Sequence, residues 1–73
     1  MNAFLASVEK KAYKMALIAT GHHEDALDIV QDAMMKLVQA YSDRPREEWK
    51  PLFYRILNNR IMDCHRRRSV RRI

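Results

Sequence analysis

Hydrophobic residues recur every three or four positions in three stretches of the chain, which is the spacing of amphipathic helices. The stretches cover about residues 3–19, 23–41 and 47–68. Gly21 separates the first two, and Pro45 lies in the polar connection before the third. One glycine, two prolines and 48% hydrophobic residues favour a helical domain over a sheet or a disordered chain. We therefore predict an all-α fold, in which the whole chain forms one compact three-helix domain.

Each predicted helix has one apolar face that would contribute to the core. In the first helix this face consists of Phe4, Leu5, Val8, Ala12, Met15, Ala16 and Ala19. In the second helix it consists of Ala26, Leu27, Val30, Ala33, Met34, Leu37, Val38 and Tyr41. In the third helix it consists of Trp49, Leu52, Phe53, Ile56, Leu57, Ile61 and Cys64. Since each face must be buried against another element, we expect one core shared by the three helices.

The charge is divided unevenly along the chain. Residues 1–40 carry four lysines and five carboxylates, a net charge of −1, whereas residues 41–73 carry ten lysines or arginines and four carboxylates, a net charge of +6. The arginines are densest near the end, and a basic tail is expected over residues 69–73. Such a division favours two surfaces with two kinds of partner, of which the basic surface suits a polyanion.

The polar face of the third helix carries side chains suited to nucleic acid. It consists of Arg55, Asn58, Asn59, Met62, His65 and Arg66, and Arg67 follows directly. Arg and Asn side chains pair bidentately with guanine and adenine edges, and further arginines contact phosphates. We therefore predict that this face and the basic end of the chain contact nucleic acid. The alternative is an ordinary solvated face.

The polar face of the second helix is acidic. It consists of Asp25, Asp28, Gln31, Asp32, Met35 and Gln39. Met35 is an adaptable apolar side chain among carboxylates and amides, a combination typical of a contact patch for a basic partner helix. The alternative is that a single exposed methionine has no function.

Residues 42–48 form a turn-rich connection, which contains Arg44 and Arg46. Trp49, the only tryptophan of the chain, follows it directly. Two interpretations of Trp49 are open. It is either an anchor of the core or, close to DNA, a side chain that stacks on an unpaired base.

The sequence contains no arrangement typical of a catalytic or metal site. The pairs His22-His23 and Cys64-His65 lack the further partners that would complete a tetrahedral site. One glycine cannot build a glycine-rich phosphate loop. We therefore expect a protein that is not an enzyme and that needs no metal and no cofactor.

The sequence also lacks the features of an exported or membrane protein. A single cysteine excludes an internal disulfide and fits a reducing compartment. No apolar run approaches the roughly 18–20 residues of a membrane span, and the N-terminus has no basic segment before an apolar one. We expect a cytoplasmic monomer without a membrane partner.

Two stretches of the chain resemble a known family. EDALDIVQDAMMKLVQAY (Glu24–Tyr41) and FYRILNNRIMDCHRRR (Phe53–Arg68) are similar to the D-A-x-D-x-x-Q-E-x-F and W-L-Y-R-I-A-x-N-x-x-x-D-x-x-R-R stretches of sigma-70 region 2. The similarity is strongest to the extracytoplasmic-function group of bacterial RNA polymerase sigma factors. Leu52 departs from the family's usual Trp, and Trp49 occupies the position of an aromatic that is commonly Phe.

The resemblance implies a domain that binds the clamp helices of the β′ subunit of core RNA polymerase. It also implies recognition and opening of the promoter −10 element through its non-template strand, and it allows an anti-sigma factor as a further partner. Sigma factors of this group carry another helical domain for the −35 element, so we expect this chain to be either an isolated region 2 domain or a truncated form of a longer protein.

Carried over position by position, the resemblance divides the candidate residues into two sets. The polymerase-binding set is Asp25, Asp28, Ile29, Gln31, Asp32 and Met35. The DNA-binding set has Arg55 and Asn59 at the family's Arg and Asn positions, Asn58, Arg66 and Arg67 as their neighbours, and Arg44, Arg46 and Trp49 at the start of the third helix.

Two other functions fit the residues. One is a basic helical domain that binds duplex DNA without polymerase, of the helix-turn-helix or nucleoid type; it would prefer double-stranded sites. The other is a basic amphipathic module that binds acidic proteins or membrane surfaces. The second is weakened because the apolar face of the third helix is needed to close the core.

Overall fold

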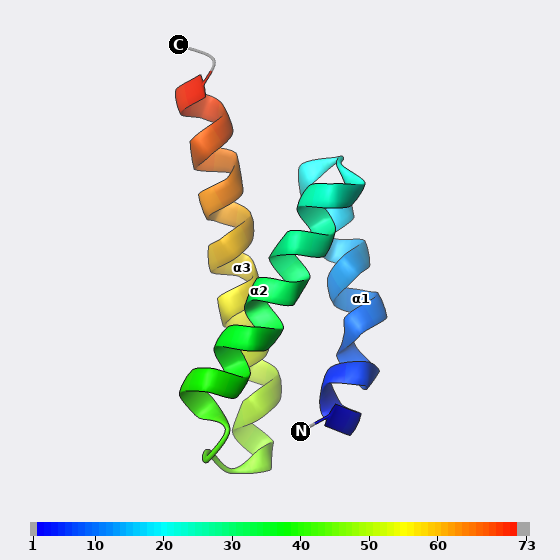
Figure 1. Ribbon diagram of the computed structural model, residues 1–73, viewed down its shortest axis with the longest axis vertical. Helices are drawn as coiled ribbons and strands as arrows, with labels where there is room; N and C mark the ends of the chain where they lie inside the picture. Colours follow the sequence, from blue (N-terminus) through cyan, green and yellow to red (C-terminus); the bar gives the residue numbers. More distant parts are fainter. Residues whose placement is uncertain (1, 72–73) are drawn as a thin grey trace.

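The computed structural model describes residues 2–71 and consists of three α-helices over that range (Figure 1). They are α1 (Asn2–Thr20), α2 (His23–Tyr41) and α3 (Arg46–Arg71). The predicted all-α, three-helix fold is confirmed. α3 is longer than the expected 47–68, because its backbone remains helical to Arg71; residues 72–73 of the expected basic tail lie outside the described residues.

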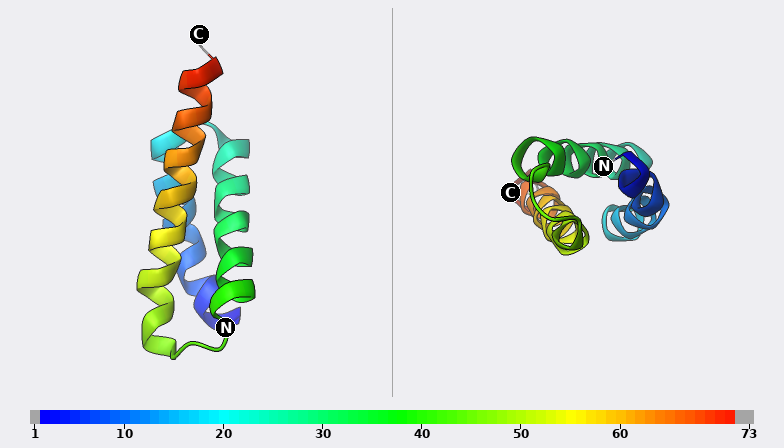
Figure 2. Two further views of the ribbon diagram at one scale, coloured as in Figure 1. Left: turned by 90° about the vertical axis from the view of Figure 1, so that its left-hand side faces the viewer. Right: turned by 90° about the horizontal axis from the view of Figure 1, so that it is seen from below.

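The three helices run alternately up and down, and α2 lies between the other two (Figure 2). α2 packs against both α1 and α3, and α1 also contacts α3. The described chain measures 43 × 20 × 15 Å because α3 is the longest helix and its C-terminal turns extend past the ends of α1 and α2 (Figure 1). Two unequal surfaces result: one along the α2–α3 pair, and one on the projecting end of α3.

The junction between α1 and α2 depends on Gly21. Its φ of +72° lies in the left-handed region, and its N–H donates a hydrogen bond of 2.7 Å to the Leu17 carbonyl. The Thr20 hydroxyl closes the same turn by donating to the Ala16 carbonyl at 2.8 Å. Glycine suits this position since it has no Cβ to oppose a positive φ.

Replacing Gly21 by alanine is expected to lower the free energy of unfolding by about 1 kcal/mol. The cost comes from the backbone alone, because a Cβ at Gly21 would meet no atom within 4 Å. Gly21→Asn is the matched control and should lose less, since asparagine tolerates the left-handed region. Urea unfolding followed by circular dichroism measures both. An equal loss in the two variants would contradict this account.

The core is formed by all three helices. Its buried residues are Leu5, Val8, Ala12 and Ala16 of α1, Ala26, Ile29, Val30, Ala33 and Leu37 of α2, and Phe53, Leu57 and Ile61 of α3. The largest fully buried side chains are Phe53, Leu37 and Leu57. Alanines on α1 and α2 are also fully covered, and their small size permits close approach of the two helices.

The predicted buried face of α2 requires a correction. Leu27 and Val38, predicted in the core, are 39% and 41% exposed, whereas Ile29, which was outside the predicted stripe, is 6% exposed. The reason is that α2 has two neighbours. Its buried arc is therefore turned towards α3, and Leu27 and Val38 are left at the outer edge.

Within residues 2–71, no helix is both long enough and apolar enough to cross a membrane.

Candidate protein and nucleic-acid interfaces

The acidic face of α2 is open to solvent. Asp28, Gln31 and Asp32 are exposed, Met35 is 57% exposed and Asp25 is half-buried. These side chains follow the first turns of the helix at spacings of three and four residues, so they lie on one side of it. Ile29, expected in the same set, is buried in the core and is one of the residues that line the groove described next.

A groove of about 430 Å³ runs between α2 and α3. Its walls are Asp25, Asp28, Ile29 and Asp32 from α2, and Arg60, Asp63, Cys64 and Arg67 from α3. Carboxylates therefore line both walls, and two guanidinium groups lie among them. Arg67, grouped with the DNA contacts by the sequence, shares this groove with the acidic residues of α2. The two candidate surfaces thus adjoin along one edge.

A second groove of about 410 Å³ lies further along the same helix pair. It is lined by Lys36 and Tyr41 from α2, and by Leu52, Arg55, Ile56, Asn59, Arg60 and Asp63 from α3. Arg60 and Asp63 line both grooves, so the two grooves adjoin along α2 and α3. The sequence pattern predicts none of Lys36, Tyr41 and Arg60 in a candidate site. Lys36 lies on the side of α2 that carries Asp25 and Asp32, and this angular position was the available signal.

A smaller, mostly apolar groove of about 280 Å³ lies between α1 and α2, where Leu5, Met34, Met35, Val38 and Gln39 meet. Met35 is therefore not an isolated exposed methionine. It continues into an apolar patch through Val38, which is itself 41% exposed. The sequence did not reveal this patch because Met34 and Val38 were both predicted to be buried.

The predicted DNA-binding side chains of α3 are on the surface. Arg55, Asn58, Asn59, Arg66 and Arg67 are all exposed. Arg44 and Arg46 are exposed as well, at the turn between α2 and α3. At about 1.5 Å of rise per residue, Arg46 and Arg67 stand roughly 30 Å apart along the helix. The set is thus spread along α3 and does not form one compact pocket.

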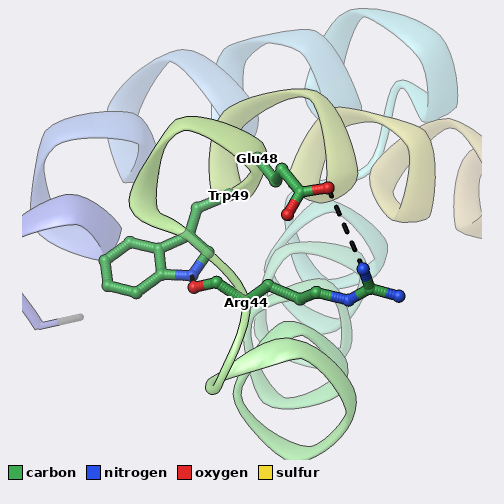
Figure 3. A network of polar contacts seen from close by, with 3 residues as sticks. All are labelled: Arg44, Glu48 and Trp49. Carbon is green, nitrogen blue, oxygen red and sulfur yellow. Dashed lines mark hydrogen bonds and ion pairs between the residues drawn. The ribbon is translucent and has the colours of Figure 1, made fainter.

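Trp49 differs from the other members of the set because its polar atom is already paired. Its indole Nε1 donates a hydrogen bond of 3.0 Å to the Arg44 carbonyl (Figure 3). Its ring centroid lies 5.8 Å from that of Phe4 in α1, at an interplanar angle of 58°. Trp49 is half-buried. These contacts support the interpretation as an anchor.

The side chain of Arg44 forms an ion pair with Glu48. Arg44 Nη1 lies 4.0 Å from Glu48 Oε1, one helical turn further along the chain (Figure 3). Both side chains are about half exposed, 57% and 46%, so water screens the pair and it adds little stability.

In the part of the chain that the structure describes, no group of three or more His, Cys, Asp or Glu side chains could hold a metal ion.

Comparison with protein families gives a match that covers almost the whole chain. The model of the family described as Sigma-70 region 2 matches residues 1–71. Comparisons with curated proteins and with solved structures gave no significant match. The chain belongs to the sigma-70 region 2 family, and it is therefore a sigma factor domain with a role in binding RNA polymerase and recognising promoter DNA.

Proposed function

We propose that the acidic face of α2 binds the clamp helices of the polymerase β′ subunit, while the exposed face of α3 and the α2–α3 turn recognise and help to open the −10 element. One observation carries the proposal. Both sets of side chains are exposed: Asp28, Asp32 and Met35 on α2, and Arg55 and Asn59 on α3. Neither set is buried in the core, so both are available to partners. A cytoplasmic location follows, since the partners are core polymerase and promoter DNA.

The polymerase contact combines charge and apolar area. Asp28 and Asp32 supply two carboxylates one helical turn apart, which suit basic side chains of a partner helix. Met35 and Val38 extend this surface with adaptable apolar area. A polar rim around an apolar centre is the usual anatomy of a specific protein interface.

The DNA contact requires no covalent chemistry, in keeping with a family of non-enzymatic initiation factors. Base capture costs a few kcal/mol of lost stacking, which hydrogen bonds to the extruded base and contacts to the backbone must offset. Arg55 and Asn59 border the second groove and lie one turn apart on α3. They are therefore placed to meet a base edge and the neighbouring phosphate.

The test is the strand and sequence preference of Asn59→Ala. With core polymerase present, wild-type protein should bind a single strand carrying a −10-like sequence more tightly than a scrambled strand. Loss of the amide should remove about 1–3 kcal/mol of this preference, because a bidentate contact to adenine is lost. Fluorescence anisotropy with labelled oligonucleotides measures it.

Arg66→Ala is the matched control, an exposed residue of the same helix. It should weaken binding to both strands equally and flatten the salt dependence, as expected for a phosphate contact. A duplex preference in the wild-type protein, or an unchanged preference in Asn59→Ala, would contradict the proposal.

A further inference from the structure

The turn between α2 and α3 is short and contains local backbone hydrogen bonds. α2 ends at Tyr41 and α3 begins at Arg46. Within the turn, the Arg44 N–H donates to the Tyr41 carbonyl at 3.1 Å. The Glu48 N–H donates to the Pro45 carbonyl at 2.9 Å and so closes the first turn of α3. These bonds shape each end of the turn but do not connect it to the rest of the domain.

Trp49 makes that connection. Its N–H holds the Arg44 carbonyl at 3.0 Å, and its ring rests against Phe4. Phe4 in turn meets the fully buried Phe53 edge to face, with ring centroids 6.3 Å apart. A backbone atom of the turn is thus coupled to the core through two aromatic contacts and one hydrogen bond.

We propose that Trp49 is a positioning residue for promoter recognition: its N–H fixes the α2–α3 turn in the shape that presents Arg44 and Arg46 to the captured strand. The inference rests on the proposed function. It replaces the earlier alternative of a base-stacking tryptophan. The anchor is favoured because the indole N–H is bonded to Arg44 and the ring already contacts Phe4, which leaves less of it for a base.

The contribution belongs to the N–H and not to the aromatic ring in general. A phenylalanine at position 49 could still pack against Phe4, but it has no donor for the Arg44 carbonyl. That carbonyl lies in an exposed turn, so water would satisfy it after the substitution and the fold would lose little. The turn would instead sample more conformations, and a flexible contact site discriminates less well.

The experiment compares Trp49→Phe with wild type in the binding assay described for Asn59→Ala. The ratio of affinities for the −10-like and scrambled strands should fall roughly three- to tenfold, the effect of losing one net hydrogen bond. The affinity for the scrambled strand and the salt slope should stay unchanged. Circular dichroism of each variant fixes a working temperature at which both are folded.

A second variant keeps the test independent of packing. Incorporating β-(3-benzothienyl)alanine at position 49 preserves the bicyclic shape and removes only the donor. It should reproduce the loss of preference seen in Trp49→Phe. Equal weakening of both strands would indicate stacking, because stacking on a base tolerates any sequence. That result, or an unchanged ratio in either variant, would overturn the inference.

Asn59→Ala in the same assay distinguishes a failure of the Trp49 inference from a failure of the proposed function. If it lowers the preference while both Trp49 variants keep it, the role of Trp49 is wrong and the proposed function stands. If wild type shows no preference, both are wrong.

Discussion

Replacing both Asp28 and Asp32 by lysine is expected to abolish binding to core RNA polymerase, with a loss of affinity of about 100-fold or more. The two carboxylates lie on the exposed side of α2, and their reversal would set like charges against a basic partner helix. Juxtaposed like charges cost several kcal/mol at an interface, in addition to the lost attraction. Co-purification with core polymerase, followed by a titration, measures the effect.

The matched control is Glu9→Lys with Asp43→Lys, which makes the same change in net charge at exposed acids outside the acidic face. It should bind polymerase as wild type does. The double lysine variant of α2 should also keep its DNA binding or gain affinity, since it adds positive charge beside Arg60 and Arg67. Normal polymerase binding by that variant would show that this face is not the contact surface.

Phe53→Ala is expected to lower the free energy of unfolding by about 3–5 kcal/mol, the range for a fully buried aromatic ring. The side chain of Phe53 is 0% exposed and its ring meets both Phe4 and Tyr54. The total free energy of unfolding of a small domain is only about 5–15 kcal/mol. Much of the Phe53→Ala variant would therefore be unfolded near physiological temperature. Thermal and urea unfolding by circular dichroism measure the loss.

Phe53→Leu is the control, because it keeps an apolar side chain of intermediate volume. Its free energy of unfolding should fall by less than half as much as that of Phe53→Ala. Tyr54→Ala should also cost less, since the tyrosine is only half-buried. If Phe53→Ala were no worse than these two, the core would not be centred where the structure has it.

The helices were predictable because their apolar residues recur at helical spacing and because Gly21 and Pro45 interrupt the pattern. The rotation of α2 was not predictable in the same way. Leu27 and Ile29 are equally hydrophobic in the sequence, and only the position of α3 decides which is buried. A helix between two neighbours has a wider buried arc than a single stripe suggests.

The candidate surfaces were predictable in composition but not in arrangement. Periodicity placed the carboxylates of α2 on one side and Asn59 and Arg55 on one side of α3, and these side chains are exposed. How the side chains of α2 lie relative to those of α3 depends on the packing of the two helices. Helical periodicity within one segment does not predict that packing. The position of Arg67 beside Asp25 and Asp28, and the paired N–H of Trp49, were visible only in the structure.

The projecting end of α3 has a consequence for how the domain meets a polyanion. Among the residues whose side chains are described, Cys64 is the last hydrophobic one that packs against the core, yet the helical backbone continues to Arg71, about 10 Å further. The sequence places arginines at 66, 67, 68 and 71, and like charges three and four positions apart oppose helix formation. Phosphates would neutralise that repulsion, so the proposed contact with a nucleic-acid strand would also stabilise the helical backbone of these last turns.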